Sequence, residues 1–284
     1  MEYLLDVLMP TYNHESFIEE AIIGVVSQKT DFSFRLLVAE DFSTDRTRAI
    51  IEQYMQKYPE IIFPFFRANN LGAFENSRLL FKEMKSKYIA LCEGDDFWTD
   101  RNKLQKQVDF LETHPNYAGC FHNAEERYED GDKASFLYCN YPEARNISFY
   151  DLSFANVIPS CSMLYRNGLF TFPEWFHELK MGDWPLNLLN AQFGDFWYMP
   201  VVMAVHRLHK KSIWMLQDAK RNNQYIIDAY DKMIKEFGYN KAYAASLTEG
   251  KQAFIKSKLS PDINGEWPLK KRAKNFMIKM ITKL

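Results

Sequence analysis

Cysteine, long apolar runs and a net excess of charge are all scarce in this chain of 284 residues. Its four cysteines form no C-x-x-C pair, which argues against a disulfide framework or a zinc site and predicts reduced, structural thiols in a cytosolic protein. No basic and apolar leader precedes the first expected strand, and no apolar run reaches the roughly 18 residues that a membrane span needs. The formal net charge of −2 argues against a nucleic-acid partner. We therefore expect a soluble or peripheral protein.

Apolar segments that alternate between strand-like and helix-like patterns are abundant in the first 115 residues. Strands are expected at 4–9, 34–39, 61–66 and 88–92, and the segments between them have the apolar spacing of helices. Such alternation implies right-handed crossovers and an α/β fold with a largely parallel sheet. Ligands of these sheets bind beyond the carboxyl ends of the strands, where this chain carries three polar loops.

The fourth of these strands runs directly into an acidic segment, Glu93-Gly94-Asp95-Asp96. Clustered carboxylates at the end of a buried strand repel one another unless a positive group joins them. Mg²⁺ and Mn²⁺ prefer oxygen ligands, so a divalent metal site is one interpretation. The other is a solvated acidic turn in which Asp100 caps the following helix.

The remainder of the chain predicts a less regular region followed by a helical extension. Further strands are expected near 118–128, 135–141, 161–165, 197–199 and 203–208, and helices at 148–155 and 186–192. Helical patterns cover 218–237 and 240–259, so we divide the chain into a domain at 1–216 and an extension at 217–284. The last part, 269–284, is a basic amphipathic helix that either lies on an anionic membrane surface or docks on its own domain.

Several motifs in order resemble family 2 glycosyltransferases of the GT-A fold, a Rossmann-like α/β class with helices on both faces of the sheet. The resemblance covers about residues 3–215. In the first half the motifs are Pro10-Thr11-Tyr12-Asn13, Val38-Ala39-Glu40-Asp41-Phe42-Ser43-Thr44-Asp45, Asn70-Leu71-Gly72 and Leu91-Cys92-Glu93-Gly94-Asp95-Asp96-Phe97-Trp98. Further along, Gly182-Asp183-Trp184-Pro185-Leu186 and His206-Arg207-Leu208-His209 resemble elements of bacterial members that build surface polysaccharides.

The resemblance implies a nucleotide-sugar donor, most often a UDP-sugar, bound with Mg²⁺ or Mn²⁺ and transferred with inversion. Thr11 and Asp41 would contact the nucleoside, Asp41 at the base, and Asp183 would be the catalytic base. The metal would be held by Asp95, Asp96 and His209. The implied donor-binding set is Pro10, Thr11, Tyr12, Asn13, Glu40, Asp41, Asn70, Gly72, Arg78, Glu93, Gly94 and Asp95.

Simpler structural roles compete with several of these assignments. Asp183 stands where a helix N-cap is expected, and His209 beside two lysines is typical of a surface histidine. Trp98 and Trp184 either stack on sugar rings or belong to the core. His14, His114, His122 and His177 are assigned structural roles only.

The sequence also departs from the family's pattern at positions that bear on the donor. Glu40 replaces a usual aspartate, Phe42 a usual small residue, and Glu93 the usual first aspartate of the acidic motif. The loop after His209 lacks the glycine that is common in the mobile segment over the donor.

The expected function is therefore metal-dependent, inverting glycosyl transfer to a glycan or lipid-linked acceptor in surface polysaccharide synthesis. The expected location is the cytoplasm, or the periphery of the inner face of the plasma membrane. Two alternatives stay open: a sugar-phosphate nucleotidyltransferase, and a nucleotide-sugar-binding protein without catalytic activity.

Overall fold

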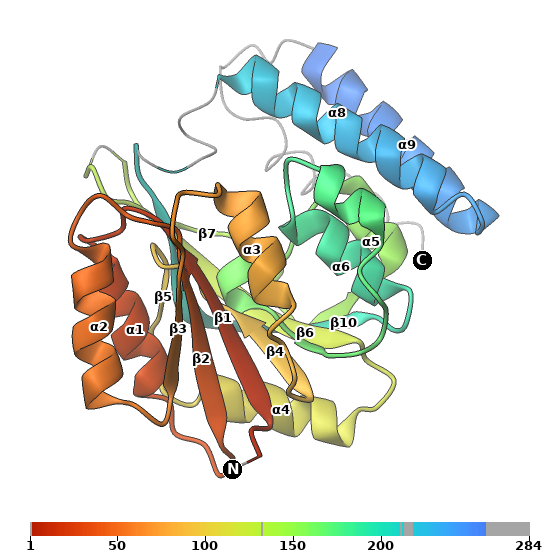
Figure 1. Cartoon of the computed structure of the whole chain (residues 1–284). Helices are drawn as coiled ribbons and strands as arrows, with labels where there is room; N and C mark the ends of the chain where they lie inside the picture. The colour runs from red at the N-terminus through yellow and green to blue at the C-terminus, as the bar shows by residue number, and fades with distance from the viewer. Residues whose placement is uncertain (1, 132, 211, 213–217, 260–284) are drawn as a thin grey trace.

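A mixed β-sheet forms the centre of the computed structural model, which describes residues 2–131, 133–210, 212 and 218–259 (Figure 1). Ten strands of the described residues belong to this sheet, and the main path has the order β3-β2-β1-β4-β9-β6-β10-β5. The strands are β1 (Leu5–Thr11), β2 (Phe34–Glu40), β3 (Ile62–Phe66), β4 (Tyr88–Leu91), β5 (Phe97–Trp98), β6 (Gly119–Tyr128), β7 (Phe136–Leu137), β8 (Arg145–Ile147), β9 (Leu164–Arg166) and β10 (Phe196–Leu208).

The parallel half of the sheet consists of the four strands expected from the sequence. β1 pairs in parallel with both β2 and β4, and β2 pairs in parallel with β3. The helices α1 (Ile18–Val26), α2 (Thr47–Lys57) and α3 (Ala73–Phe81) connect these strands in turn. The carboxyl ends of β1, β2 and β4 therefore meet at one edge of the sheet.

The other half contains the antiparallel pairs. β9 lies antiparallel between β4 and β6, whereas β10 runs parallel to β6. The two strands predicted at 197–199 and 203–208 are one strand, β10, whose pairing with β6 shifts register at Met199 and Val202. The strand predicted at 135–141 is confined to the two residues of β7.

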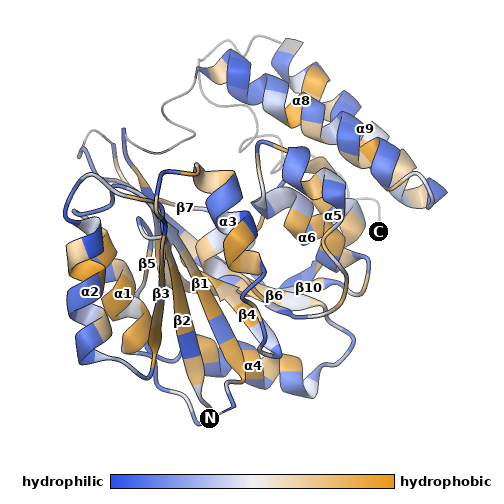
Figure 2. Ribbon diagram, in the orientation of Figure 1, coloured by the Kyte–Doolittle hydropathy of each residue, from blue (hydrophilic) through white to orange (hydrophobic). Residues whose placement is uncertain are grey.

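Helices cover both faces of the sheet, and the strands contribute apolar side chains to each face (Figure 2). Leu5, Val7 and Met9 of β1 enter the core beneath α1, α2 and α4 (Lys103–Thr113), whereas Leu8 enters the opposite core. α3, α5 (Phe149–Phe154) and α6 (Asp183–Ala191) pack on that second face. Burial of alternate residues on both faces explains why these strands read as continuous apolar runs.

The C-terminal helices α8 (Ala219–Glu236) and α9 (Lys241–Leu259) pack on each other and, through α9, on α5 (Figure 1). The hydroxyls of Ser153 and Ser246 lie 2.9 Å apart, and a Cβ at Gly250 would stand 1.9 Å from the Ser153 carbonyl. Tyr230, Met233 and other residues of these helices share the core of α5 and α6. The boundary at 216/217 stays a prediction, and residues 260–284, including the expected basic helix, lie outside the described residues.

No helix among the described residues has the length and apolarity needed to cross a membrane.

Candidate active site

An open cavity of about 2220 Å³ lies beyond the carboxyl ends of β1, β2 and β4 and extends to α6 and α8. Most of the predicted site residues line it: Pro10, Thr11, Tyr12, Asn13, Asp41, Asn70, Gly72, Arg78, Glu93, Asp95, Asp96 and Asp183. The other three, Glu40, Gly94 and His209, are not among the lining residues, although His209 Nε2 lies 3.1 Å from Asp95 Oδ2, which is. The loops after β1, β2 and β4 thus meet at one cavity, which is also bordered by Asp183, 173 residues after Pro10 in the chain.

The loops after β1 and β2 hold each other in place at one side of the cavity. Asn13 and Phe42 have positive φ angles of 54° and 60°, a conformation that is uncommon outside glycine. The Asn13 amide N–H donates to Ser43 Oγ at 3.0 Å, and the Thr44 N–H donates to Asn13 Oδ1 at 2.8 Å. These bonds compensate for the unfavourable backbone conformation and fix the entrance of the cavity.

Glu40 is fully buried beneath these loops and does not line the cavity, whereas its neighbour Asp41 does. Its Oε1 accepts the Ser43 N–H at 2.5 Å, and its Oε2 has no hydrogen-bond partner among the described residues. The Glu40 side chain therefore holds the loop after β2 through its bond to the Ser43 backbone.

Asp41 connects β2 to the turn that precedes α3. Its carboxylate accepts the N–H groups of Leu71 and Gly72 at 2.8 and 2.9 Å, and Asn70 Nδ2 donates to the Asp41 carbonyl at 3.0 Å. Gly72 has a φ of 83°, which a residue with a side chain rarely adopts. Burial raises the pKa of Asp41 despite these bonds. Asp41 thus fixes the loop and also borders the cavity.

Arg78 lies on α3 at the same side of the cavity. Its Nε donates to Glu75 Oε2 at 2.6 Å, one turn earlier on the helix. The guanidinium is therefore held at the cavity wall by an ion pair within its own helix.

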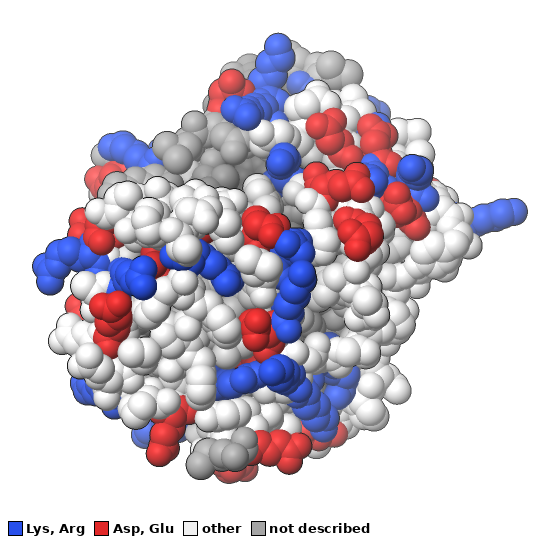
Figure 3. All heavy atoms as spheres, viewed as in Figure 1, with Lys and Arg blue, Asp and Glu red and all other residues white. Residues whose placement is uncertain are grey.

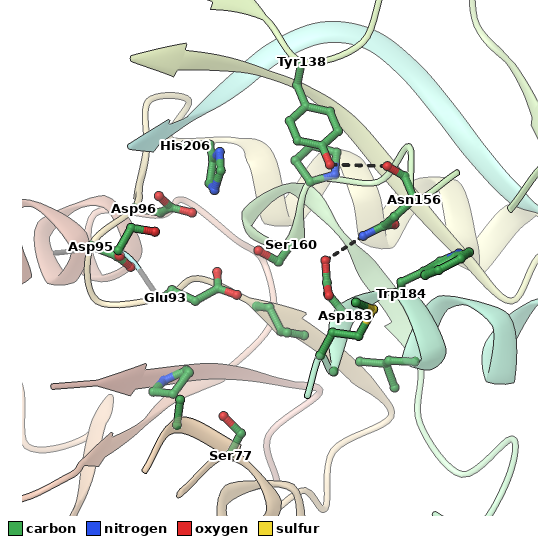
Figure 4. Close-up of a pocket in the computed structure, with 18 of the residues that line it drawn as sticks. Ser77, Glu93, Asp95, Asp96, Tyr138, Asn156, Ser160, Asp183, Trp184 and His206 are labelled. Carbon is green, nitrogen blue, oxygen red and sulfur yellow. Dashed lines mark hydrogen bonds between the residues drawn. The ribbon is translucent and has the colours of Figure 1, made fainter. Parts of the chain in front are cut away.

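The three carboxylates after β4 have very different surroundings (Figure 4). Asp95 Oδ2 lies 3.1 Å from His209 Nε2 and 3.7 Å from His14 Nε2. Asp96 Oδ1 accepts the backbone N–H of Arg207 at 2.8 Å, which attaches the acidic loop to β10. Glu93 Oε2 has no hydrogen-bond partner within the described chain. The solvated acidic turn expected as the alternative is therefore not what forms here.

These surroundings separate the acidities of the three groups. Burial alone would raise the pKa of Asp95, but the imidazoles of His14 and His209 hold it well below its usual range. Burial, together with the charge of Asp96, raises the pKa of Glu93 to about 8. Burial raises the pKa of Asp96 to about 6 in spite of His206 nearby. Perturbed carboxylates of this kind mark a candidate functional site.

The donor atoms of this cluster determine how a metal would fit. Within the described residues, no group of three or more His, Cys, Asp or Glu side chains is arranged to hold a metal ion by itself. Asp95 and His209 offer one carboxylate and one imidazole on the same side of the loop. Mg²⁺ and Mn²⁺ at phosphate-binding sites usually take one or two protein ligands and fill the other positions with phosphate and water. The pair fits that requirement.

Gly94 is required by the close approach of the acidic loop to β1. A Cβ at this position would lie 2.4 Å from Thr11 Oγ1. The glycine therefore lets the carboxylates reach the end of β1, where His14 Nδ1 also lies 3.1 Å from Thr11 Oγ1.

Asp183 is the first residue of α6 and lies on the opposite side of the cavity from Asp95 (Figure 4). Gly182 occupies the N-cap position, so Asp183 is not the cap. Its Oδ2 accepts Asn156 Nδ2 at 2.6 Å. Burial raises the pKa of Asp183, against the effect of the hydrogen bonds it accepts. The group is thus a stronger proton acceptor than an ordinary aspartate once it is ionised.

The contacts of four further residues test roles expected from the sequence. Asp100 does not cap α4: Asn102 is the N-cap, and Asp100, two residues earlier, accepts the Asn102 N–H at 2.8 Å. His209 is buried, not a surface histidine. Trp98 and Trp184 are buried and donate their indole N–H groups to the carbonyls of Cys161 and Leu152. Trp98 is thus a core residue, whereas Trp184 also borders the cavity.

His14 and Asn156 are site residues that sequence reasoning missed. His14 is assigned a structural role from the sequence, yet it faces Asp95, a residue 81 positions further along. Its place directly after the Pro10–Asn13 segment is the signal that was available. Asn156 lies in an irregular segment, and no sequence pattern marks it.

Charges of both signs are interspersed on the visible face of the molecule (Figure 3). On the face seen in Figure 3, Lys and Arg side chains alternate with Asp and Glu. The prediction of no nucleic-acid partner stays a prediction.

The model of the family described as "Glycosyl transferase family 2" matches residues 6–170. An uncharacterised protein of Mycobacterium tuberculosis (strain H37Rv) is 36% identical over 213 residues, which are 74% of this chain and 60% of that protein. This chain therefore matches less than two thirds of the length of that relative. A Bacillus subtilis protein named as the teichuronic acid biosynthesis glycosyltransferase TuaG is 27% identical over 214 residues, 74% of this chain and 81% of its own length.

Solved structures share the fold at low sequence identity. Staphylococcus aureus TarS 1–349 in complex with UDP-GlcNAc has a TM-score of 0.62 and 19% identity, over 89% of this chain and 73% of that one. The mannosyltransferase PcManGT from Pyrobaculum calidifontis, in complex with GDP-Man and Mn²⁺, has a TM-score of 0.60 and 15% identity, over 99% and 81% of the two chains.

Proposed function

The chain belongs to glycosyl transferase family 2, and we propose that it is a metal-dependent, inverting glycosyltransferase that uses a nucleotide-sugar donor, a UDP-sugar first of all. The observation that carries this proposal is the pairing of two sites in one cavity. Asp95 with His209 lies at the strand-end side, and Asp183 lies at the α6 side. The first fits a cation with a diphosphate, and the second fits a base for the attacking hydroxyl.

The donor proposal has support from the loops and from the structural neighbours. TarS was solved with UDP-GlcNAc, and PcManGT with GDP-Man and Mn²⁺; both share this fold. Here Thr11, Asp41 and the Asn70–Gly72 turn border the same side of the cavity as Asp95. We assign the nucleoside to these loops and the diphosphate to the end of β4.

Asp95 and His209 would hold the metal, with Asp96 fixing the loop that carries Asp95. When bound, such an ion neutralises the negative charge that develops on a departing nucleoside diphosphate. Asp95 is suited to this task because it remains ionised beside His14 and His209. Glu93, which is held protonated by burial, does not add another negative charge at ordinary pH.

Asp183 would accept the proton of the acceptor hydroxyl. The hydroxyl oxygen forms a bond to the anomeric carbon as the bond from that carbon to the diphosphate breaks, and the proton moves to Asp183. A placed carboxylate base contributes roughly 10²- to 10⁴-fold to such a step. A single displacement with one base inverts the anomeric carbon, whereas retention by double displacement needs a carboxylate nucleophile.

The acceptor and the pathway are proposed on weaker similarity. TuaG is named for teichuronic acid biosynthesis, and a Shigella flexneri relative, 26% identical over 203 residues, is named as the dTDP-rhamnosyl transferase RfbG. These names support a glycan or lipid-linked acceptor in surface polysaccharide synthesis. Attachment to the inner face of the plasma membrane depends on residues 269–284 and stays a prediction of the sequence.

The test is Asp183→Asn, measured as UDP release after a thermal-shift screen with Mn²⁺ has selected a UDP- or GDP-sugar. We expect donor binding to be kept and turnover to fall by about 10²- to 10⁴-fold, because the amide cannot accept the proton. Asp195→Asn is the matched control, since burial also raises the pKa of Asp195 but the residue lies outside the cavity lining. Turnover of Asp183→Asn equal to that of the parent would remove Asp183 as the base. Donor binding without any turnover by the parent would favour the non-catalytic alternative.

A further inference from the structure

Three side chains form a continuous hydrogen-bonded row that ends on Asp183. Asn187 Nδ2 donates to Asn156 Oδ1 at 3.0 Å, and Asn156 Nδ2 donates to Asp183 Oδ2 at 2.6 Å. Asn187 lies on α6, one helical turn after Asp183, whereas Asn156 comes from the segment after α5. Both ends of the row are thus on one helix, and the amide that joins them comes from a separate segment. Figure 4 shows the bond between Asn156 and Asp183.

The row fixes which end of the Asn156 amide faces Asp183. An asparagine side chain has a donor end and an acceptor end, and the bond from Asn187 occupies the acceptor end. The NH₂ group is therefore directed at the carboxylate. The reversed orientation would place the Asn156 carbonyl against Asp183 and would repel its ionised form.

The backbone of Asn156 is held as well. The Tyr138 hydroxyl donates to the Asn156 carbonyl at 3.4 Å, and Cys139 Sγ donates to the carbonyl of Val157, the next residue, at 3.3 Å. The amide thus has little freedom to turn away from Asp183.

Asn187 is expected to lower the stability of the fold if its role is only structural. It is fully buried in α6, and its Oδ1 has no hydrogen-bond partner among the described residues. A buried acceptor without a partner lowers stability, and an apolar side chain at this position would avoid that loss. In return, the Asn187 amide donates the hydrogen bond to Asn156 Oδ1.

We propose that Asn156 and Asn187 are positioning residues of the transfer reaction, which keep the Asp183 carboxylate ionised and oriented toward the acceptor hydroxyl. Asn156 acts on Asp183 directly, and Asn187 acts through Asn156. This inference rests on the proposed role of Asp183 as the base. A hydrogen bond donated to a carboxylate favours the charged form, which is the form that accepts a proton.

Other ionisable groups also face Asp183 and influence its titration. They are His206 of β10, Tyr138 between β7 and β8, and Glu93 after β4, all of which line the same cavity. These groups stay unchanged in the variants below, so a difference between two variants reports on the amide row.

The experiment compares Asn156→Ala and Asn187→Ala with Asn190→Ala as the control. Asn190 is matched to Asn187 because it is on the same helix, is fully buried, and has an Oδ1 without a partner in the described residues, but it donates to Leu186 and not to Asn156. Two readouts are used: kcat for UDP release as a function of pH, and the titration of the Asp183 carboxyl carbon by NMR, assigned with Asp183→Asn.

For Asn156→Ala we expect kcat at neutral pH to fall about 10- to 100-fold, the size of one hydrogen bond to a charged group. KM for the donor should stay within about twofold, and both the acidic limb of kcat and the Asp183 titration should move to higher pH, because the charged form loses a donor. Asn187→Ala should move the titration in the same direction by less, and Asn190→Ala should leave it in place.

An Asp183 titration that is the same in Asn156→Ala, Asn190→Ala and the parent would overturn the inference. Asn156 is only half-buried, so its variant carries the test if Asn187→Ala does not fold. If the parent shows no turnover at all, the proposed function fails, but the titration still decides whether the row controls the ionisation of Asp183.

Discussion

Buried carboxylates occur at both ends of the parallel half of the sheet, and the two ends differ in how many hydrogen-bond donors the protein provides to them. At the amino-terminal end, Asp6 of β1 is fully buried and accepts hydrogen bonds from Arg35 Nε at 2.7 Å, Ser86 Oγ at 2.6 Å and the Lys85 N–H at 2.8 Å. Burial opposes its ionisation, but Arg35 and the other donors lower its pKa overall. Both oxygens of this carboxylate are used within the protein.

At the carboxyl-terminal end, the carboxylates after β4 are left with fewer donors. Glu93 has an oxygen without a partner among the described residues, and burial raises its pKa to about 8. Asp95 is paired with imidazoles that can also bind a metal. A buried carboxylate whose oxygens are both used serves stability, whereas Glu93, with an oxygen that has no partner in the described residues, has the surroundings expected at the proposed ligand site.

The largest effect should come from Asp95→Asn, which removes the ionised carboxylate of the proposed metal site. We expect turnover, and UDP affinity in the presence of Mn²⁺, to fall by about 100-fold or more, because the loss of a charged ligand weakens both metal and diphosphate binding. Calorimetry of UDP binding with and without Mn²⁺ measures this. Asp100→Asn is the control, since Asp100 follows the next strand, β5, and lies outside the cavity lining. Equal affinities for the parent and Asp95→Asn would disprove the metal site.

Asp6→Ala should have the next largest effect, and it should act on stability. Removal of one partner leaves the Arg35 guanidinium facing a buried, uncompensated position, which typically costs about 3–5 kcal/mol. Urea unfolding measures this loss, while turnover per folded molecule should stay close to that of the parent. The double variant Asp6→Ala with Arg35→Met should recover part of the stability. A loss below about 1 kcal/mol would show that the two ends of the sheet do not differ as described.

Glu93→Gln should have a smaller effect that depends on pH. Because the pKa of Glu93 in the folded chain is about 8, above its ordinary value of 4.5, the folded state binds more protons than the unfolded state between these pH values. Its contribution to stability therefore decreases as the pH rises from 4.5 through 8. The variant lacks this group, so its stability relative to the parent should increase as the pH rises from 4.5 toward 8, with the difference vanishing below pH 4.5.

The contribution of Asp6 to stability should depend on pH in the opposite direction. Its pKa is lowered by folding, so its contribution is present above the ordinary value of 3.8 and is lost on acidification. Unfolding curves at several pH values should thus separate Glu93→Gln from Asp6→Ala. Parallel stability curves for the parent and Glu93→Gln would contradict the raised pKa.

The sequence predicts the parallel strands and their polar ends because apolar runs and strand-to-loop boundaries are local features. β1 to β4 and the loops after β1, β2 and β4 are found where the pattern places them. The pairing of His14 with Asp95 and of Asn156 with Asp183 is not local. It arises only when β4 aligns with β1 and when α6 packs beside the segment after α5.

The errors in the sequence predictions have similar causes. β10 was divided in two because its central residues, Val201 and Val202, lie at a register shift where the alternation breaks down. For Trp98 and Trp184 the sequence predicts two roles, because an aromatic residue beside an acidic motif suits a sugar or a core equally well. The distant partners of Trp98 place it in the core, whereas Trp184 is held by Leu152 and also borders the cavity.

The most direct test of the account is the thermal stability of the parent, Asp6→Asn and Asp95→Asn, each measured with and without Mn²⁺ and UDP. Ligands that bind the folded state raise its melting temperature. We predict that Asp6→Asn melts at a lower temperature than the parent but is stabilised by Mn²⁺ and UDP to the same extent. Asp95→Asn should gain little from these ligands, whatever its melting temperature without them. Equal stabilisation of Asp95→Asn and the parent by Mn²⁺ and UDP would contradict the assignment of the donor site to this end of the sheet.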